Sequence, residues 1–134
     1  MFGKKPTAVK AQNRIDSLIG SGTRIEGNVI FAGGLRVDGE IKGNVTATES
    51  SPGTLVLGEN ARIEGEIRVA HVVLNGTVVG PIHAAETLEL QPGARVTGDV
   101  EYTSIEIQQG AIIHGRMTHL EQVKSVELKL ASSN

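Results

Sequence analysis

Short segments in which apolar and polar residues alternate fill the chain from about residue 17 to residue 120, and the alternation restarts at a nearly regular interval. Each restart contains the tripeptide Gly-x-(Val/Ile/Met), which begins at Gly27, Gly43, Gly65, Gly80, Gly98 and Gly115. Successive glycines in this series are 16, 22, 15, 18 and 17 residues apart. Repeats of this length indicate a solenoid, in which each repeat forms one coil and packs against its neighbours.

Each repeat predicts three short β-strands. An apolar β-branched residue stands two places before each glycine, at Ile25, Ile41, Ile63, Val78, Val96 and Ile113. A further apolar position lies upstream, at Ile19, Val37, Leu57, Leu74, Leu90 and Ile107. Because alternate residues of a strand point to opposite sides, these positions predict side chains that face the inside of the coil. The expected fold is an all-β β-helix of about six coils, with about 17 residues and three strands in each.

Ungapped matches between repeats set the register of the predicted coils. Residues 19–27 match residues 57–65, and residues 87–100 match residues 104–117. Between the strands, corners at which φ can be positive are expected at Pro52-Gly53, Gly58, Gly76, Pro92-Gly93 and Gly110. The interval of 22 residues contains Thr-Glu-Ser-Ser-Pro-Gly, which predicts a loop at one corner. Outward-facing charges alternate in sign along the strands, and we expect ion pairs between adjacent coils.

The composition narrows the range of functions. The chain has 13 Lys and Arg against 15 Asp and Glu, so no basic surface for nucleic acid is expected. It has no cysteine, and no glycine-rich phosphate-binding motif occurs, so neither a nucleotide nor another cofactor is predicted. The few aromatic residues, Phe2, Phe31 and Tyr102, predict a core of narrow layers made from aliphatic side chains.

Four histidines are the remaining candidates for catalysis or metal binding. His83 and His114 are expected on the outer surface and His71 at a corner, whereas His119 shares the column of Tyr102 and is expected to pack inward. No two of them occupy one column in adjacent coils, as a metal site between coils would require. We therefore predict no catalytic, cofactor-binding or metal-binding residue, and a protein that is not an enzyme.

A left-handed hexapeptide-repeat acyltransferase is the alternative to a structural solenoid. Apolar residues six positions apart do occur, as at Leu57, Ile63 and Val69. That fold needs equal steps of six residues and a period of about 18, whereas the step from Val37 to Ile41 is only four residues. The irregular step favours the structural solenoid.

The two ends of the stack are expected to carry the function. An end coil has unpaired backbone groups and an open apolar layer, which soluble solenoids usually cover with a cap. No amphipathic helix or capping repeat is recognisable at either terminus, so we predict end-to-end polymerisation. The alternative is that a short segment folds over each end or that the terminal strands fray. The predicted contact residues are Ile15, Leu18 and Ile19 at one end, and Val123, Val126, Leu128 and Leu130 at the other.

The N-terminus predicts weak membrane binding. Met1 and Phe2 form an apolar pair beside Lys4 and Lys5, and such a segment binds the headgroup region of an anionic membrane. The alternative is a disordered start whose lysines only keep it solvated. No apolar run approaches the ~20 residues of a membrane span, and no signal-peptide pattern is present, so a cytoplasmic location is expected.

The chain resembles the bactofilins, a family of bacterial cytoskeletal proteins. The likeness lies in the opening Met-Phe-Gly-Lys-Lys, in residues 17–45 (SLIGSGTRIEGNVIFAGGLRVDGEIKGNV) and in the Gly-x-(Val/Ile) columns that follow. It implies a right-handed β-helix over residues 17–130, an N-terminal tail over residues 1–16 and a short C-terminal tail over residues 131–134. It also implies polymerisation without nucleotide, with subunits joined head-to-head and tail-to-tail.

The same resemblance implies partners and a location. Members of the family dock on the inner face of the cytoplasmic membrane and recruit peptidoglycan synthases or hydrolases and other morphogenesis proteins. Lipid of that membrane and further copies of the chain are the other implied partners. The residues that match are Met1, Phe2, Lys4 and Lys5 for the membrane-targeting peptide, and Val126, Leu128 and Leu130 for the terminal coil that forms a polymer contact.

Overall fold

The computed structural model describes residues 15–121, which form fifteen β-strands and no helix. Every strand pair in this part of the chain is parallel. The strands are β1 (Ser17–Ile19), β2 (Arg24–Glu26), β3 (Val29–Phe31), β4 (Gly34–Val37), β5 (Glu40–Lys42), β6 (Val45–Ala47), β7 (Thr54–Leu57), β8 (Arg62–Glu64), β9 (Ile67–Leu74), β10 (Thr77–Val79), β11 (Ile82–Leu90), β12 (Arg95–Thr97), β13 (Val100–Ile107), β14 (Ile112–His114) and β15 (Met117–His119).

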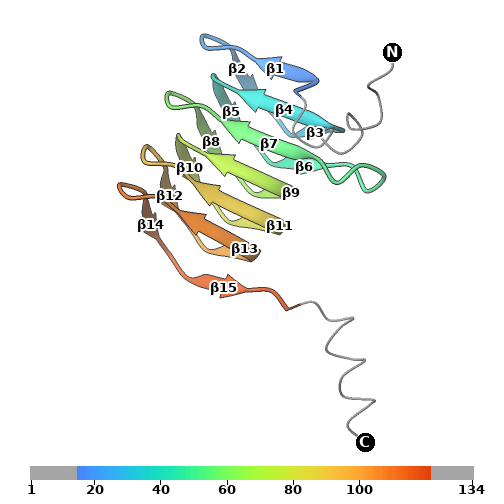
Figure 1. The fold of residues 1–134 in the computed structure, drawn as a ribbon. Coiled ribbons are helices and arrows are strands. Elements are labelled where there is room, and N and C mark those ends of the chain that lie inside the picture. Colours follow the sequence, from blue (N-terminus) through green and yellow to red (C-terminus); the bar gives the residue numbers. More distant parts are fainter. Residues whose placement is uncertain (1–14, 122–134) are drawn as a thin grey trace, which may run out of the picture.

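The strands form a stack of coils with three sides (Figure 1). The first side consists of β1, β4, β7 and the C-terminal halves of β9, β11 and β13. The second side is the six-stranded sheet β2-β5-β8-β10-β12-β14. The third side consists of β3, β6, the N-terminal halves of β9, β11 and β13, and β15. The prediction of an all-β solenoid of about six coils is confirmed, and its right-handed sense stays a prediction.

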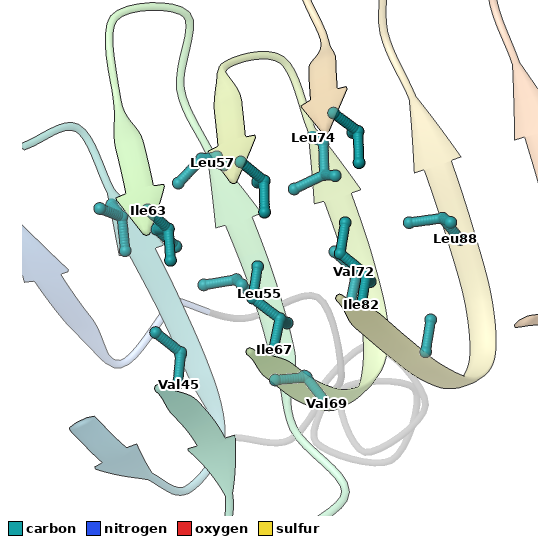
Figure 2. Close-up of a cluster of buried hydrophobic side chains, with 14 of the residues drawn as sticks. Val45, Leu55, Leu57, Ile63, Ile67, Val69, Val72, Leu74, Ile82 and Leu88 are labelled. Carbon is teal, nitrogen blue, oxygen red and sulfur yellow. The ribbon is translucent and has the colours of Figure 1, made fainter. Parts of the chain in front are cut away.

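The register of the strands confirms the predicted inward columns. Leu57 pairs with Leu74, and Leu90 pairs with Leu74 and Ile107, as the repeats require. On the second side, Ile63 lies between Ile41 and Val78. These columns meet inside the coil, where aliphatic side chains from all three sides pack together (Figure 2). Hydrophobic burial therefore fixes the register, because a slip of one residue would turn every inward side chain outward.

One corner changes along the stack. In the second coil β6 and β7 are separated by residues 48–53, the loop predicted from the long interval, which projects from the stack in Figure 1. From the third coil onward the corresponding strands merge, so β9, β11 and β13 run through the corner without a break. Two residues of the bulge in β11, Ala85 and Glu86, lie opposite the single Ala70 of β9.

Glycine at the corner between the second and third sides allows the coils to approach. A Cβ atom at Gly65 would overlap the carbonyl oxygen of Gly43, and one at Gly115 would overlap that of Gly98. The corners predicted to have positive φ, Gly53 between the third and first sides and the others between the first and second sides, are only partly confirmed. Gly53 and Gly110 have positive φ, but the remaining ones do not. At the remaining corners glycine is required for another reason, because a Cβ atom would overlap atoms of the neighbouring coil. These remaining corners are Gly58, Gly76 and Gly93.

Ion pairs on the outer surface lie mainly within coils, and the prediction that they would join adjacent coils is wrong for four of them. Each of the four joins residues two apart: Arg24–Glu26, Arg36–Asp38, Arg62–Glu64 and Glu66–Arg68. Residues i and i+2 of a strand lie on the same face about 6.8 Å apart, a distance that an arginine side chain spans easily. A hydrogen bond between the His83 and Glu101 side chains does cross between coils.

Candidate assembly surfaces

The last described coil leaves its inner side chains uncovered. Ile107 is 48% exposed, although Leu90, its neighbour in the same column, is fully buried. On the third side Met117 is 41% exposed, whereas Val100 in the preceding coil is fully buried. All four residues are apolar and the paired strands keep the same register, so the exposure arises from the lack of a covering coil in the described part of the chain.

Backbone groups at this end also lack strand partners within residues 15–121. The N-terminal half of β13 pairs with β15, but the C-terminal half, Ser104–Ile107, has a partner only in β11. β14 and β15 likewise pair on one edge alone. Parallel strands with one free edge offer N–H and C=O groups to another strand. The C-terminal end of the described stack thus combines open strand edges with an open apolar layer.

The first coil forms the opposite end. Ile19, Ile25 and Val29 are half-buried and pack against the core, and Phe31 is buried. Leu18 is 62% exposed because it lies in the outward column of Arg36 and not in the inward column of Ile19.

The predicted contact residues are thus distributed unevenly. Ile15 is exposed at the start of the described chain, Ile19 contributes to the open layer, and Leu18 lies on the outer surface of the first side. Their part in a polymer contact stays a prediction. The other predicted site residues lie outside the described residues: Met1, Phe2, Lys4, Lys5, Val123, Val126, Leu128 and Leu130.

The histidines have structural surroundings. His83 lies on the outer surface and its Nδ1 is 2.6 Å from Oε1 of Glu101 in the next coil, and His71, within β9, lies 3.0 Å from the Thr87 hydroxyl. His119 is in the predicted column and contacts the Tyr102 ring edge-on at 6.0 Å, but its expected burial is wrong. It is exposed because no described coil covers it. Within residues 15–121 no three His, Cys, Asp or Glu side chains come together as metal ligands would.

Electrostatics on the second side are set by neighbouring arginine and lysine residues. Nε of Arg62 donates a hydrogen bond of 2.7 Å to Oε2 of Glu64, and this bond is the largest cause of a lowered pKa at Glu64. The positive charges of Arg62, of Lys42 in the preceding coil and of Arg24 lower it further. On the first side, a hydrogen bond to Asp38 raises the pKa of Arg36. Charged groups of adjacent coils therefore influence one another even where the direct ion pairs lie within a coil.

Taken together, these features describe a β-solenoid whose first and last described coils carry inward side chains that are less buried than those of the middle coils. The family model described as "Bactofilin: Polymer-forming cytoskeletal" matches residues 17–118, and the chain belongs to this family. It is thus a polymer-forming cytoskeletal protein that associates with itself, and the prediction that it is not an enzyme is confirmed by its family. The family match also removes the acyltransferase alternative.

Two curated relatives come from Myxococcus xanthus (strain DK1622). The chain is 27% identical to bactofilin BacP over 110 residues, which are 81% of this chain and 44% of BacP. It is 30% identical to bactofilin BacO over 102 residues, which are 76% of this chain and 78% of BacO. The chain thus spans less than half the length of BacP. No solved structure matches the chain with significance. Residues 15–121 contain no helix long and apolar enough to cross a membrane.

Proposed function

We propose that the chain polymerises end to end without nucleotide into filaments on the inner face of the cytoplasmic membrane, where it positions cell-wall and morphogenesis proteins. The observation that carries the end-to-end geometry is the exposure of inward columns in the terminal coils. A further coil stacked on Ile107 and Met117 would cover the same columns that are fully buried in the middle of the stack, and the predicted contact residues Val126, Leu128 and Leu130 follow these two residues in the chain. Fully burying an aliphatic side chain contributes roughly 1.5–3 kcal/mol.

Stacking also explains why no nucleotide is needed. Each added coil pairs strand edges and buries apolar surface in one step, which is the same free-energy change that joins coils within one chain. The described residues contain no phosphate-binding loop between a strand and a helix, since they form no helix.

The charge distribution supports a membrane contact through the N-terminus. Residues 15–121 contain 7 Lys and Arg against 14 Asp and Glu, a formal charge of 7 − 14 = −7. Residues 1–14 contain four basic residues and no acidic one. An anionic membrane surface repels the solenoid but attracts the N-terminal segment, by about 1 kcal/mol per Lys or Arg. A filament multiplies these weak contacts, since every subunit carries one such segment. The same repetition would present an array of identical sites to cell-wall synthases, hydrolases and other morphogenesis proteins.

Electron microscopy and sedimentation of the purified chain without nucleotide test the end-to-end polymerisation. Flotation with anionic liposomes tests the membrane contact. Wild-type protein is expected to form filaments and to float with the liposomes. Ile107→Arg places a charge in the open end layer and is expected to leave short species that do not pellet. Ile30→Arg is the matched control, because Ile30 is 72% exposed and lies in the outward column of the third side. Filaments of Ile107→Arg equal to those of the wild type would contradict the end-to-end contact.

Deletion of residues 2–5 separates the membrane contact from polymerisation. The deleted chain is expected to form filaments of normal length that no longer float with anionic liposomes. Flotation that persists after the deletion would show that the membrane contact lies elsewhere.

A further inference from the structure

The second side differs from the other two sides in its outward columns. Each of its strands has three residues, and the central one faces inward, so two residues per coil face outward. One outward column consists of Arg24, Glu40, Arg62, Thr77, Arg95 and Ile112. The other consists of Glu26, Lys42, Glu64, Val79, Thr97 and His114.

The two outward residues that one coil contributes to this side form a row. In the first three coils the charges alternate in sign within each row and from one row to the next. The row Arg24/Glu26 is followed by Glu40/Lys42 with the signs reversed, and by Arg62/Glu64 with the signs restored. The Arg24–Glu26 and Arg62–Glu64 rows close ion pairs of 3.1 and 2.7 Å, and all four of these side chains remain more than one third exposed. Considerable charged surface on this side therefore stays in contact with water.

This pattern is complementary to itself. When a second copy is turned by 180° about a line parallel to the stack and placed face to face, each row meets its own reversed copy. Arg24 then faces Glu26 of the second copy, and Glu40 faces Lys42 of the second copy. Such a two-fold contact is isologous, so every favourable pair occurs twice.

The remaining three rows of the second side also tolerate this contact. Thr77/Val79, Arg95/Thr97 and Ile112/His114 contain no pair of like charges. Val79 and Ile112 are 37% and 40% exposed, so two of the large exposed hydrophobic side chains of the described chain lie on this side. None of the six rows brings like charges together.

The same rotation about the midline brings like charges together on the other two sides. Each of these sides has a central outward column, whose residues would meet themselves. On the first side this column contains Arg36, Glu89 and Glu106. On the third side it contains Arg68 and Glu101. Like-charge contacts oppose association, so the second side is the one suited to a parallel copy.

We propose that the second side is a lateral contact through which two filaments of this protein pair side by side. The proposal rests on the end-to-end filament proposed above. At a strand spacing of about 4.8 Å, six rows span only about 29 Å, which is too small an area for a stable dimer of single subunits. Along a filament, however, the weak contacts add up. Because the contacts are charged and exposed, salt should weaken them, while the apolar end contacts persist.

Negative-stain microscopy of wild-type filaments at low and high salt is the first test. We expect paired filaments at ~0.02 M salt and single filaments of the same length at ~0.5 M, where the Debye length falls from roughly 20 Å to about 4 Å. Pairing that is unchanged at high salt would overturn the charged contact. If the wild-type chain forms no filament in any condition, the end-to-end proposal fails and the lateral proposal fails with it.

Charge variants of one row give the decisive test. Glu40→Lys turns the row Glu40/Lys42 into two positive charges that face two positive charges, and we expect the paired filament length to fall at least ~10-fold. The double variant Glu40→Lys with Lys42→Glu reverses the row but keeps it complementary to its own copy. We expect this double variant to pair like the wild type, although its charges no longer alternate along the stack.

Glu86→Lys is the control, because it makes the same change in net charge at an exposed residue in the bulge of β11, away from the second side. Loss of pairing in Glu86→Lys equal to that in Glu40→Lys would show that net charge alone sets pairing, and would overturn the proposal. So would filaments of Glu40→Lys that pair normally, or a double variant that stays single while its thermal unfolding and filament length match the wild type.

Discussion

The four residues Arg-Ile-Glu-Gly occur twice in the chain, in the first coil at residues 24–27 and in the third coil at residues 62–65. Both copies form the same structure, a three-residue strand of the second side followed by the corner glycine. Ile63 is fully buried, whereas Ile25 is only half-buried. Identical sequence and identical local geometry therefore give different burial, and the difference comes only from the coils on either side.

The glycines of the two copies show the same dependence. Both have positive φ, +141° at Gly27 and +152° at Gly65. A Cβ atom at Gly65 would overlap the carbonyl oxygen of Gly43, whereas no described atom lies within 4 Å of a Cβ atom at Gly27. The positive φ favours glycine in both coils, and the contact with a preceding coil adds a second requirement at Gly65.

Glycine-to-alanine substitution should show the largest difference between the copies. An alanine at this φ costs about 1–3 kcal/mol at either position, and overlap with the backbone adds roughly another 1–3 kcal/mol at Gly65 only. Gly65→Ala is therefore expected to lose more stability to urea than Gly27→Ala, measured at protein concentrations too low for assembly. Gly27→Ala is instead expected to reduce the polymer that sediments, because its methyl group lies on the end surface. Equal losses of stability would contradict the dependence on the neighbouring coil.

Truncation of the inward isoleucines should show the next largest difference. Ile63→Ala leaves a cavity in the middle of the stack and is expected to cost ~2–5 kcal/mol of unfolding free energy. Ile25→Ala removes the same atoms from a half-buried position, and we expect about half that loss in unassembled protein. Urea denaturation followed by circular dichroism measures both. In assembled filaments the two losses should converge, and a difference that persists there would mean that Ile25 does not become covered.

The sequence predicts the columns of this fold well because their cause is periodic. Inward residues such as Leu57, Leu74 and Leu90 recur in register, and burial permits no other register. The sequence does not predict which coil ends the covered stack, so His119 is in the expected column but is exposed. Ion-pair partners also escape prediction. Neighbours at i+2 in a strand lie about 6.8 Å apart and neighbours in the next coil about 4.8 Å apart. An arginine side chain can reach both, so its rotamer decides which partner it contacts.

The candidate assembly surfaces also have one feature that the sequence predicts and another that only the structure makes visible. The open end layer follows from counting coils, since any last coil lacks a neighbour. The charge pattern of the second side is also written in the sequence, but it becomes visible only when the rows are placed in register. Glu26, Lys42 and Glu64 are 16 and 22 residues apart in the chain, and the loop at residues 48–53 conceals their alignment.

Replacing the glutamate in each copy of Arg-Ile-Glu-Gly, Glu26 or Glu64, should give the smallest effect on stability. Glu64 is bound more closely by Arg62, at 2.7 Å, than Glu26 is by Arg24, at 3.1 Å, and it is less exposed. Exposed pairs contribute little, so we expect Glu64→Gln to lower Tm by only ~1–2 °C and Glu26→Gln by less.

The pKa of Glu64 lies below its ordinary value of 4.5 in the folded chain, because the hydrogen bond from Arg62 favours the charged form. Its contribution to stability is therefore present above pH 4.5 and is lost as the pH falls through the lower, folded-state pKa. Thermal unfolding at pH 7 should distinguish Glu64→Gln from the wild type, and the difference should vanish in strong acid. A difference that grows on acidification would contradict this sign and would mean that the Arg62 pair does not stabilise the third coil.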